Sequence, residues 1–223
     1  MCGIMGYIGK GNAIPVIVDG LARLEYRGYD SAGIAVYRPD NDASEAYLQV
    51  TKKKGRLADM VEALGDAPAS QLGIGHTRWA THGVPSDKNA HPHTDCSGNI
   101  ALIHNGIIEN YAPLRKQLML EGHDFVSETD TEVMVHLIEK YYEDSLEEAV
   151  RKALGAVYGS FAIVVISAQE PDKIIAAKKA SPMIVGLGEG ENYLASDIPA
   201  ILGRTKKVYI IEDNEFVILT ADS

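Results

Sequence analysis

Apolar runs rich in β-branched residues lie toward both ends of the chain, and this arrangement restricts the possible folds more than any other feature. Five such runs follow residue 160, with short turn segments between them: FAIVVIS, KIIAA, PMIVGLG, KVYIIE and EFVILT. Runs at this spacing favour antiparallel pairing. Earlier strand candidates are residues 5–8, 34–37, 47–51, 71–77 and 100–104. Strands at both ends with helices between them predict packed sheets that are covered by helices.

Helical patterns fill the remaining segments. Apolar residues recur at helical spacing at positions 14, 18, 21 and 24, and a helix over residues 56–64 would end at Gly65. Asn110 can cap a helix that runs to about Glu121, and two more helices are expected over residues 131–142 and 146–158. Because no repeat, low-complexity tract or flexible linker interrupts the chain, we expect one domain over residues 1–223.

The composition argues against several classes of partner. The 223 residues carry a formal net charge of -10, which disfavours binding to nucleic acid or to an anionic membrane. No apolar run is long enough to span a bilayer, and the amino end lacks the pattern of a secretory signal. Two cysteines do not make a disulfide framework in a chain of this length. We therefore expect a cytoplasmic protein.

Cys2 is the first candidate for chemistry. Removal of Met1 would leave a free α-amine on the same residue as the thiol. An α-amine titrates near pH ~7.7–8, so it could act as the general base for its own thiol. Such a nucleophile would need no histidine partner. Position alone favours the simpler interpretation, a small buried residue before the first strand.

The HNG tripeptide, residues 104–106, follows the apolar strand candidate NIALI. The amide of Asn105 and a backbone N–H near Gly106 are donors of the kind that stabilise the oxyanion of acyl transfer. Glycine would also let the backbone approach a substrate closely. A tight Asn-Gly hairpin turn explains the same residues. The following IIEN is not an obvious partner strand, so both interpretations stay open.

Two further segments carry groups that could bind an amino acid. In HTRWATHG, residues 76–83, Arg78 offers a planar fork that fits an α-carboxylate, and Trp79 could exclude water. Composition alone favours an ordinary surface loop here. In SETDTE, residues 127–132, Asp130 could bind an ammonium group. Thr129 and Glu132 have the spacing of a helix capping box, which the sequence favours, although one segment can serve both purposes.

Two other patterns resemble sites but are weaker. Histidines 76, 82, 91 and 93 with Cys96 are of the residue types that bind zinc, yet their spacing matches no closed four-ligand pattern, so we expect no metal site. The glycine-rich GLGEGEN, residues 186–192, departs from the spacing of a dinucleotide-binding loop. We expect no cofactor.

The order of several motifs resembles the class II glutamine amidotransferases, a family of N-terminal nucleophile hydrolases. The motifs are CGIMGYIG at Cys2, LEYRGYDSAG at residue 24, HTRWATHG, NAHPH at residue 89, HNGIIEN, SETDTE and ENYLASD at residue 191. Together they span nearly the whole chain. The resemblance implies an α+β fold, a four-layer αββα sandwich of two antiparallel sheets between helical layers.

The resemblance also implies a role for each candidate residue. Cys2 would be the nucleophile and its freed amine the base, with Asn105 and the Gly106 N–H as the oxyanion hole. Arg78 would bind the α-carboxylate of L-glutamine, assisted by Thr81 and His82. Asp130 would bind the α-ammonium group, Trp79 lies in a loop that closes over glutamine, and Arg27 would organise the site.

RGYDSAG and RWATHG favour the aminosugar branch of this family. That branch implies a downstream sugar-isomerase domain, absent from this chain, where fructose 6-phosphate binds and ammonia converts it to glucosamine 6-phosphate. The longer enzyme is expected to be a homodimer. Three alternatives stay open: a glutamine sensor that binds without turnover, a structural domain that holds a metal with its histidines, and a relative that makes phosphoribosylamine or asparagine.

Overall fold

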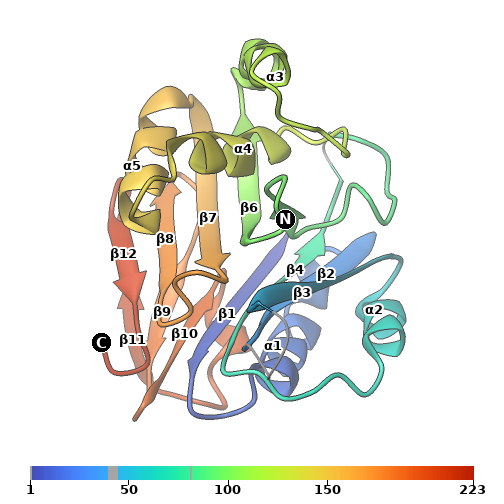
Figure 1. Cartoon of the computed structure of the whole chain (residues 1–223). Helices are drawn as coiled ribbons and strands as arrows, with labels where there is room; N and C mark the ends of the chain where they lie inside the picture. The colour runs from blue at the N-terminus through green and yellow to red at the C-terminus, as the bar shows by residue number, and fades with distance from the viewer. Residues whose placement is uncertain (1, 40–44, 81) are drawn as a thin grey trace.

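Two antiparallel β-sheets pack face to face, and helices cover the outer face of each sheet (Figure 1). The structure, a computed structural model, describes residues 2–39, 45–80 and 82–223. The α+β, four-layer αββα sandwich implied by the sequence is confirmed. Within the described residues, no helix is both long enough and apolar enough to span a bilayer.

The larger sheet contains seven strands in the order β11-β9-β10-β1-β4-β2-β3, and all neighbours are antiparallel. Its strands are β1 (Gly3–Gly9), β2 (Ser31–Arg38), β3 (Tyr47–Lys54), β4 (Leu72–Arg78), β9 (Ile184–Leu187), β10 (Glu191–Ala195) and β11 (Lys207–Ile210). Gly3 at the start of β1 is opposite Thr77 near the end of β4. This register brings Cys2 close to Arg78.

The smaller sheet contains five strands in the order β12-β8-β7-β6-β5, also antiparallel. Its strands are β5 (His93–Thr94), β6 (Ile100–Ile108), β7 (Gly159–Ser167), β8 (Ile174–Lys179) and β12 (Phe216–Leu219). β6 is longer than expected, because Asn105 and Gly106 pair with Ala162 and Phe161 on β7. The hairpin-turn interpretation of the Asn-Gly pair is therefore wrong.

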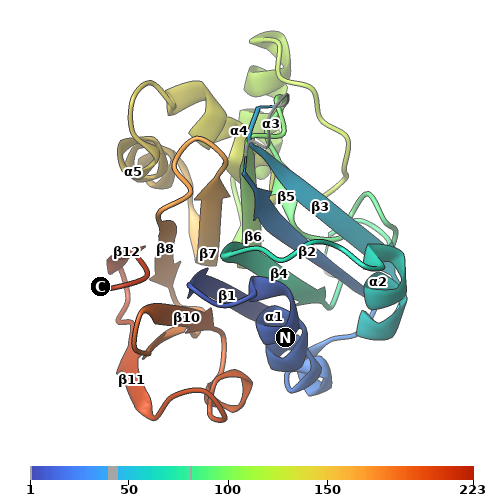
Figure 2. The ribbon, with the colours of Figure 1, turned by 60° about the horizontal axis from the view of Figure 1, so that its bottom comes forward.

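The helices form two outer layers on opposite sides of the molecule (Figures 1 and 2). α1 (Ala13–Ala22) and α2 (Leu57–Leu64) pack on the seven-stranded sheet. α4 (Glu132–Tyr141) and α5 (Leu146–Ala156) pack on the five-stranded sheet, and α3 (Tyr111–Leu120) packs on α4. Short 3-10 turns lie at Glu25–Arg27 and Ile198–Ala200.

Three apolar cores lie between the four layers, because alternate residues of each strand face opposite sides of a sheet. On β7, Val164 packs between the sheets while Val165 packs under α4 and α5. On β1, Ile4 faces the space between the sheets and Met5 packs under α1. Burial on both faces explains continuous apolar runs such as that of β7.

Some expected details are different in the structure. β10 is not among the expected strands, since ENYLA is short and only weakly apolar. α1 forms as expected, but Ile14 and Val18 are only half-buried, and its buried residues are Ala13, Val16, Ile17, Gly20 and Leu21. The Asn110 side chain donates to the Ala156 carbonyl and accepts from the Tyr158 N–H instead of capping α3.

Candidate active site

A cavity of about 320 Å³ contains the Cys2 sulfur on its wall. This volume is near the lower end of the roughly 300–1,000 Å³ typical of small-molecule sites. Both sheets and the segment before α4 contribute to the wall. The lining residues are Cys2, Arg27, His76, Arg78, Trp79, His91, His104, Asn105, Gly106, Ile107, Thr129, Asp130, Thr131, Ser160, Ser181 and Pro182. Seven of the nine predicted site residues are thus on one cavity.

Cys2 is half-buried immediately before β1, and its backbone and thiol are both held by neighbours. Its carbonyl accepts hydrogen bonds from Arg27 Nε (3.2 Å) and Asn105 Nδ2 (3.1 Å). The Trp79 N–H donates to Sγ at 3.2 Å. Burial raises the pKa of the Cys2 thiol, although the Trp79 N–H acts in the opposite direction. The thiol is therefore neutral near pH 7 and needs a base to become a nucleophile.

Asn105 is held on both sides of its amide. Oδ1 lies 2.9 Å from His76 Nε2, while Nδ2 donates one of its two hydrogens to Cys2. Burial lowers the pKa of His76 to about 3, so the ring is neutral and its Nε2 carries the proton that Oδ1 accepts. The second Nδ2 hydrogen is left for a ligand. His76 therefore positions a donor, a role that the sequence interpretation missed.

Gly106 occupies a backbone conformation that favours glycine. Its φ is 133°, and a Cβ there would lie 2.1 Å from the Ser160 carbonyl oxygen on β7. Glycine thus lets the two strands approach closely at the wall of the cavity.

Arg78 ends β4 and is buried, with 4% of its surface exposed. Its Nη2 donates to the carbonyls of His82 and Gly83. Its Nη1 is buried and has no hydrogen-bond partner among the residues that the structure describes. An unpaired buried donor of a cation is costly unless a ligand satisfies it, and a carboxylate is the matching acceptor.

Asp130 lies in the segment immediately before α4, and its side chain is 5% exposed. Oδ2 accepts from the Ile108 N–H at 2.7 Å, and Oδ1 lies 4.0 Å from His82 Nδ1. The capping box predicted for Thr129 and Glu132 is wrong. α4 begins at Glu132, whose carboxylate accepts instead from the backbone N–H groups of residues 126 and 127.

The remaining predicted residues are arranged less directly. Arg27 spans from the Cys2 carbonyl to Asp197, with Nη1 3.0 Å from Oδ2, and so connects β1 to the segment after β10. Trp79 is 52% exposed, and its ring lies edge-on to that of Tyr29. His82 is not among the lining residues, and its ring contacts Tyr111. Thr81 lies outside the described residues.

Asp30 is a second residue that the sequence interpretation did not single out. Its carboxylate accepts from the Ala80 N–H and from Ser31 Oγ, and its own N–H donates to the Arg78 carbonyl at 3.1 Å. It thereby fixes the backbone that carries Arg78 and Trp79. The sequence showed a carboxylate inside the RGYDSAG motif, but it did not show that this carboxylate contacts the backbone near Arg78.

The structure also shows where the two weaker patterns lie, the histidines with Cys96 and the glycine-rich segment. His76, His91 and His93 form a buried row, with ring centroids 4.3 and 4.8 Å apart. Cys96 is not part of this row and lies beside His123 and His136. GLGEGEN forms the end of β9, a turn and the start of β10.

The αββα sandwich with a thiol before its first strand, at a cavity between the sheets, is the architecture of the N-terminal nucleophile hydrolases. The model of the glutamine amidotransferase domain matches residues 76–203. The chain belongs to the glutamine amidotransferase domain family.

Curated relatives and solved structures agree with this assignment. The chain is 55% identical to a glutamine–fructose-6-phosphate aminotransferase (isomerizing) of Clostridium tetani and to another of Thermus thermophilus, over all of this chain and 36% of each relative. It therefore spans about a third of their length. The glutamine phosphoribosylpyrophosphate amidotransferase of Bacillus subtilis has a similar fold, with a TM-score of 0.77, 24% identity and coverage of 99% of this chain and 49% of that chain.

Proposed function

We propose that this domain hydrolyses L-glutamine to glutamate and ammonia, with Cys2 as the nucleophile after removal of Met1. One observation carries the proposal. A thiol, a positioned amide donor, a buried arginine with an unpaired nitrogen and a buried carboxylate surround a single cavity. These groups are complementary to the reacting amide and to the two charged ends of glutamine.

Arg78 and Asp130 would determine the orientation of the substrate in the cavity. The Nη1 of Arg78 would donate to the α-carboxylate, and the Asp130 carboxylate would accept from the α-ammonium group. Because both charges are buried, a ligand that lacks either charged end would leave one of them unpaired, at substantial cost. Selectivity for a free amino acid over a glutamine side chain inside a protein follows from this arrangement.

The chemistry would proceed through a thioester. The freed α-amine of Cys2 takes the thiol proton, and Sγ attacks the side-chain carbonyl carbon of glutamine. Asn105 Nδ2 and the Gly106 N–H stabilise the oxyanion. When the C–N bond breaks, the protonated amine gives its proton to the leaving nitrogen, which departs as ammonia. Water then attacks the thioester, releasing glutamate and restoring the thiol.

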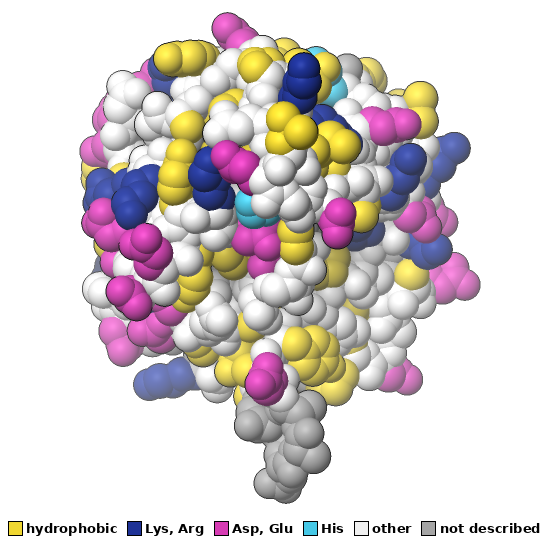
Figure 3. Space-filling view, turned by 45° about the horizontal axis from the view of Figure 1, so that its top comes forward, with side chains coloured by type: hydrophobic (Ala, Val, Ile, Leu, Met, Phe, Trp, Pro, Cys, Tyr) yellow, Lys and Arg dark blue, Asp and Glu magenta, His cyan; other side chains and the backbone are white. Residues whose placement is uncertain are grey.

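The use of the ammonia is inferred from the relatives named above. We propose that it reaches a sugar-isomerase domain of a homodimeric enzyme in the cytoplasm, where fructose 6-phosphate becomes glucosamine 6-phosphate. Small molecules rather than nucleic acids or membranes are the proposed ligands. In support, acidic and basic side chains are interspersed over the face shown in Figure 3, and the net charge is -10.

The test combines glutaminase activity with the mass of the intact protein. Purified protein should lack Met1 and release ammonia from glutamine, whereas Cys2→Ser should lose at least about 10³-fold in kcat. An electrophilic glutamine analogue should label Cys2 and leave Cys96 unmodified in the same digest. Binding of glutamine without turnover by processed protein would refute the hydrolase proposal in favour of a sensor.

A further inference from the structure

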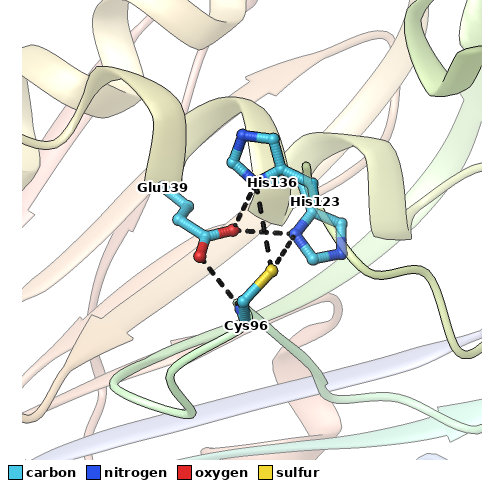
Figure 4. A group of neighbouring side chains, drawn as sticks. All are labelled: Cys96, His123, His136 and Glu139. Carbon is cyan, nitrogen blue, oxygen red and sulfur yellow. Dashed lines mark hydrogen bonds and ion pairs between the residues drawn. The ribbon is translucent and has the colours of Figure 1, made fainter. Parts of the chain in front are cut away.

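Four side chains with metal-binding atoms meet away from the active-site cavity: Cys96, His123, His136 and Glu139 (Figure 4). Cys96 lies in the turn between β5 and β6, and His123 follows α3. His136 and Glu139 are one turn apart on α4. The cluster therefore joins three segments that are distant in the sequence. None of its members is among the residues that line the described cavity around Cys2.

The ligand atoms are nearly at the spacing of a tetrahedral site. Cys96 Sγ lies 3.9 Å from His123 Nδ1 and 3.7 Å from His136 Nδ1. Bond lengths of 2.3 Å to sulfur and 2.0–2.1 Å to nitrogen or oxygen would place tetrahedral ligands about 3.6 Å apart for S–N and about 3.3 Å for N–O. All four ligand atoms lie within 4.8 Å of one another.

The other two contacts are shorter. Glu139 Oε2 lies 2.7 Å from His123 Nδ1 and 2.9 Å from His136 Nδ1. These distances fit hydrogen bonds, and outward shifts of about 0.5 Å would bring them to the tetrahedral values. Both imidazoles already direct the same nitrogen, Nδ1, toward one carboxylate oxygen and one sulfur.

We propose that Cys96, His123, His136 and Glu139 form a structural Zn²⁺ site. A thiolate with two imidazoles and one carboxylate suits zinc, whereas Ca²⁺ and Mg²⁺ require oxygen ligands. Four protein ligands make a closed site with no position left for a substrate. The role is therefore structural, and the metal takes no part in glutamine hydrolysis.

Neighbouring groups lie beside three of the four ligands, as groups around metal sites do. The Asp124 N–H donates to Cys96 Sγ at 3.4 Å, and the Cys96 N–H donates to Glu139 Oε1 at 3.2 Å. His136 Nε2 lies 3.9 Å from Glu132 Oε1 and is buried without a hydrogen-bond partner among the described residues. A carboxylate behind a histidine fixes which ring nitrogen faces a metal.

A cluster held only by hydrogen bonds is the simpler alternative. Two histidines and one carboxylate would satisfy each other without sulfur, and Cys96 would then be an ordinary surface thiol. The alternative gives no reason for a thiol that lies within 3.9 Å of both imidazoles and accepts a backbone N–H. It predicts no affinity for zinc, which separates it from the proposal.

A metal in this cluster would connect two segments of the chain that carry active-site residues. Ligands at residues 123, 136 and 139 enclose the segment of residues 124–135, which contains Asp130. Cys96 ties this segment to the turn before β6, the strand that carries Asn105. Zinc bound only by the folded chain would stabilise it by mass action.

The experiment uses the whole chain and exploits its two cysteines. The protein is freed of metal by a chelator and then dialysed against Zn²⁺. It should retain one zinc per chain and unfold at a higher temperature than the metal-free protein. Cys2→Ser, which lacks the other thiol, should retain this zinc although it loses glutaminase activity. In the Cys2→Ser background, Cys96→Ser should bind zinc at least ~100-fold more weakly. Failure of the hydrolase proposal would leave these results unchanged.

Cobalt supplies a direct readout of the sulfur ligand. Co²⁺ added to metal-free Cys2→Ser protein should give a thiolate-to-cobalt absorption band, which Cys96→Ser and His136→Ala in that background should abolish. Metal-free variants must match the circular dichroism of the metal-free parent, so that loss of binding is not loss of fold. Equal zinc retention with and without Cys96, or no zinc retained by the parent, would overturn the proposal.

Discussion

At the scale of single residues, the oxyanion donor depends on a histidine that touches no reacting atom. His76 Nε2 donates to Asn105 Oδ1 and thereby keeps Nδ2 directed toward Cys2 and the cavity. Without this bond the amide can rotate and present an oxygen to the oxyanion. We predict that His76→Leu lowers kcat by about 10- to 100-fold, less than the ~10²–10³-fold loss of a donor. KM for glutamine should change little.

Steady-state glutaminase assays of His76→Leu beside Asn105→Ala provide the check. His76 is 1% exposed, so the unfolding midpoint in urea must be measured as well. A KM that rises while kcat stays constant would assign His76 to substrate binding instead of to donor orientation.

Four buried histidines make stability fall in acid, whereas His136, whose pKa Glu132 and Glu139 raise despite its burial, acts in the opposite direction. Burial lowers the pKa of His76 to about 3, and it lowers the pKa of His91, His93 and His104 below the ordinary value. Below pH ~6.5 the unfolded chain binds protons at these positions and the folded chain does not. The stabilisation is complete above pH ~6.5. It falls with decreasing pH, by at most about 1.4 kcal/mol per pH unit for each of these histidines.

Urea unfolding at about pH 7.5, 6 and 5 measures this slope, since ordinary carboxylates titrate mainly at lower pH. His91→Asn keeps an acceptor for the His104 N–H, which now donates to His91 Nδ1. It should reduce the slope by about 1.4 kcal/mol per pH unit. An unchanged slope in this variant would contradict the assignment.

At the scale of elements, β6 must pair regularly with β7 and also present the proposed oxyanion donors to the cavity. Gly106 makes both possible. Its φ of 133° and the 2.1 Å approach of a Cβ to the Ser160 carbonyl predict that Gly106→Ala separates β6 from β7. The cost should be about 1–3 kcal/mol, with a loss of kcat because Asn105 moves too. Urea unfolding and glutaminase assays measure both effects.

Gly98→Ala is the matched control. Gly98 also has a positive φ, 76°, but no atom of the described residues would lie within 4 Å of its Cβ. This variant should lose about 1–2 kcal/mol from its backbone conformation alone and keep full kcat. If both variants lose activity equally, backbone strain near β6 would be sufficient to explain the loss. The close approach of the two strands at Gly106 would then not be its cause.

Sequence patterns predict elements well where burial is continuous and poorly where tertiary contacts decide. The C-terminal runs became β7, β8, β9, β11 and β12. Burial on both faces explains the continuous apolar signal of β7 and β8, whereas β11 and β12 are largely exposed edge strands that were recognised by their β-branched and aromatic residues. β10 was missed, since its five residues depend on pairing with β1 and β9. Asn110 was expected to cap a helix, yet a distant segment, the end of α5, offered its side chain better partners.

The candidate site shows the same division. Cys2, Asn105, Arg78 and Asp130 could be selected because they lie in motifs whose order resembles one family, although their residue types alone favoured simpler interpretations or left them open. The contacts of Asp30, Asp197 and His76 could not be selected, because each acts through a partner between about 30 and 170 residues away. Cys96 was grouped with the nearest histidines in sequence, but the fold places it beside His123 and His136.

At the scale of the whole molecule, the two sheets must keep a fixed alignment, because each supplies part of the site. Cys2, immediately before β1, and Arg78 are positioned by the seven-stranded sheet, while Asn105 and Gly106 belong to the five-stranded sheet. The apolar core between the sheets holds this alignment over most of their area, and at the site the bonds from Asn105 to Cys2 and from His76 to Asn105 also connect the sheets. Misplacement of reacting groups by about 1 Å can cost ~10²-fold in rate. The core between the sheets should therefore affect catalysis more than the outer cores do.

Val164 and Val165 test this idea, because they are the same residue type at neighbouring positions on β7. Both are fully buried, but Val164 faces the space between the sheets and Val165 faces α4 and α5. Each change to alanine should destabilise the protein by about 2–3 kcal/mol through the cavity it leaves. Val164→Ala should also lower kcat/KM by about 3- to 10-fold, because the sheets can then shift relative to each other. Equal activity in the two variants, at matched urea midpoints, would show that the alignment of the sheets does not depend on their shared core.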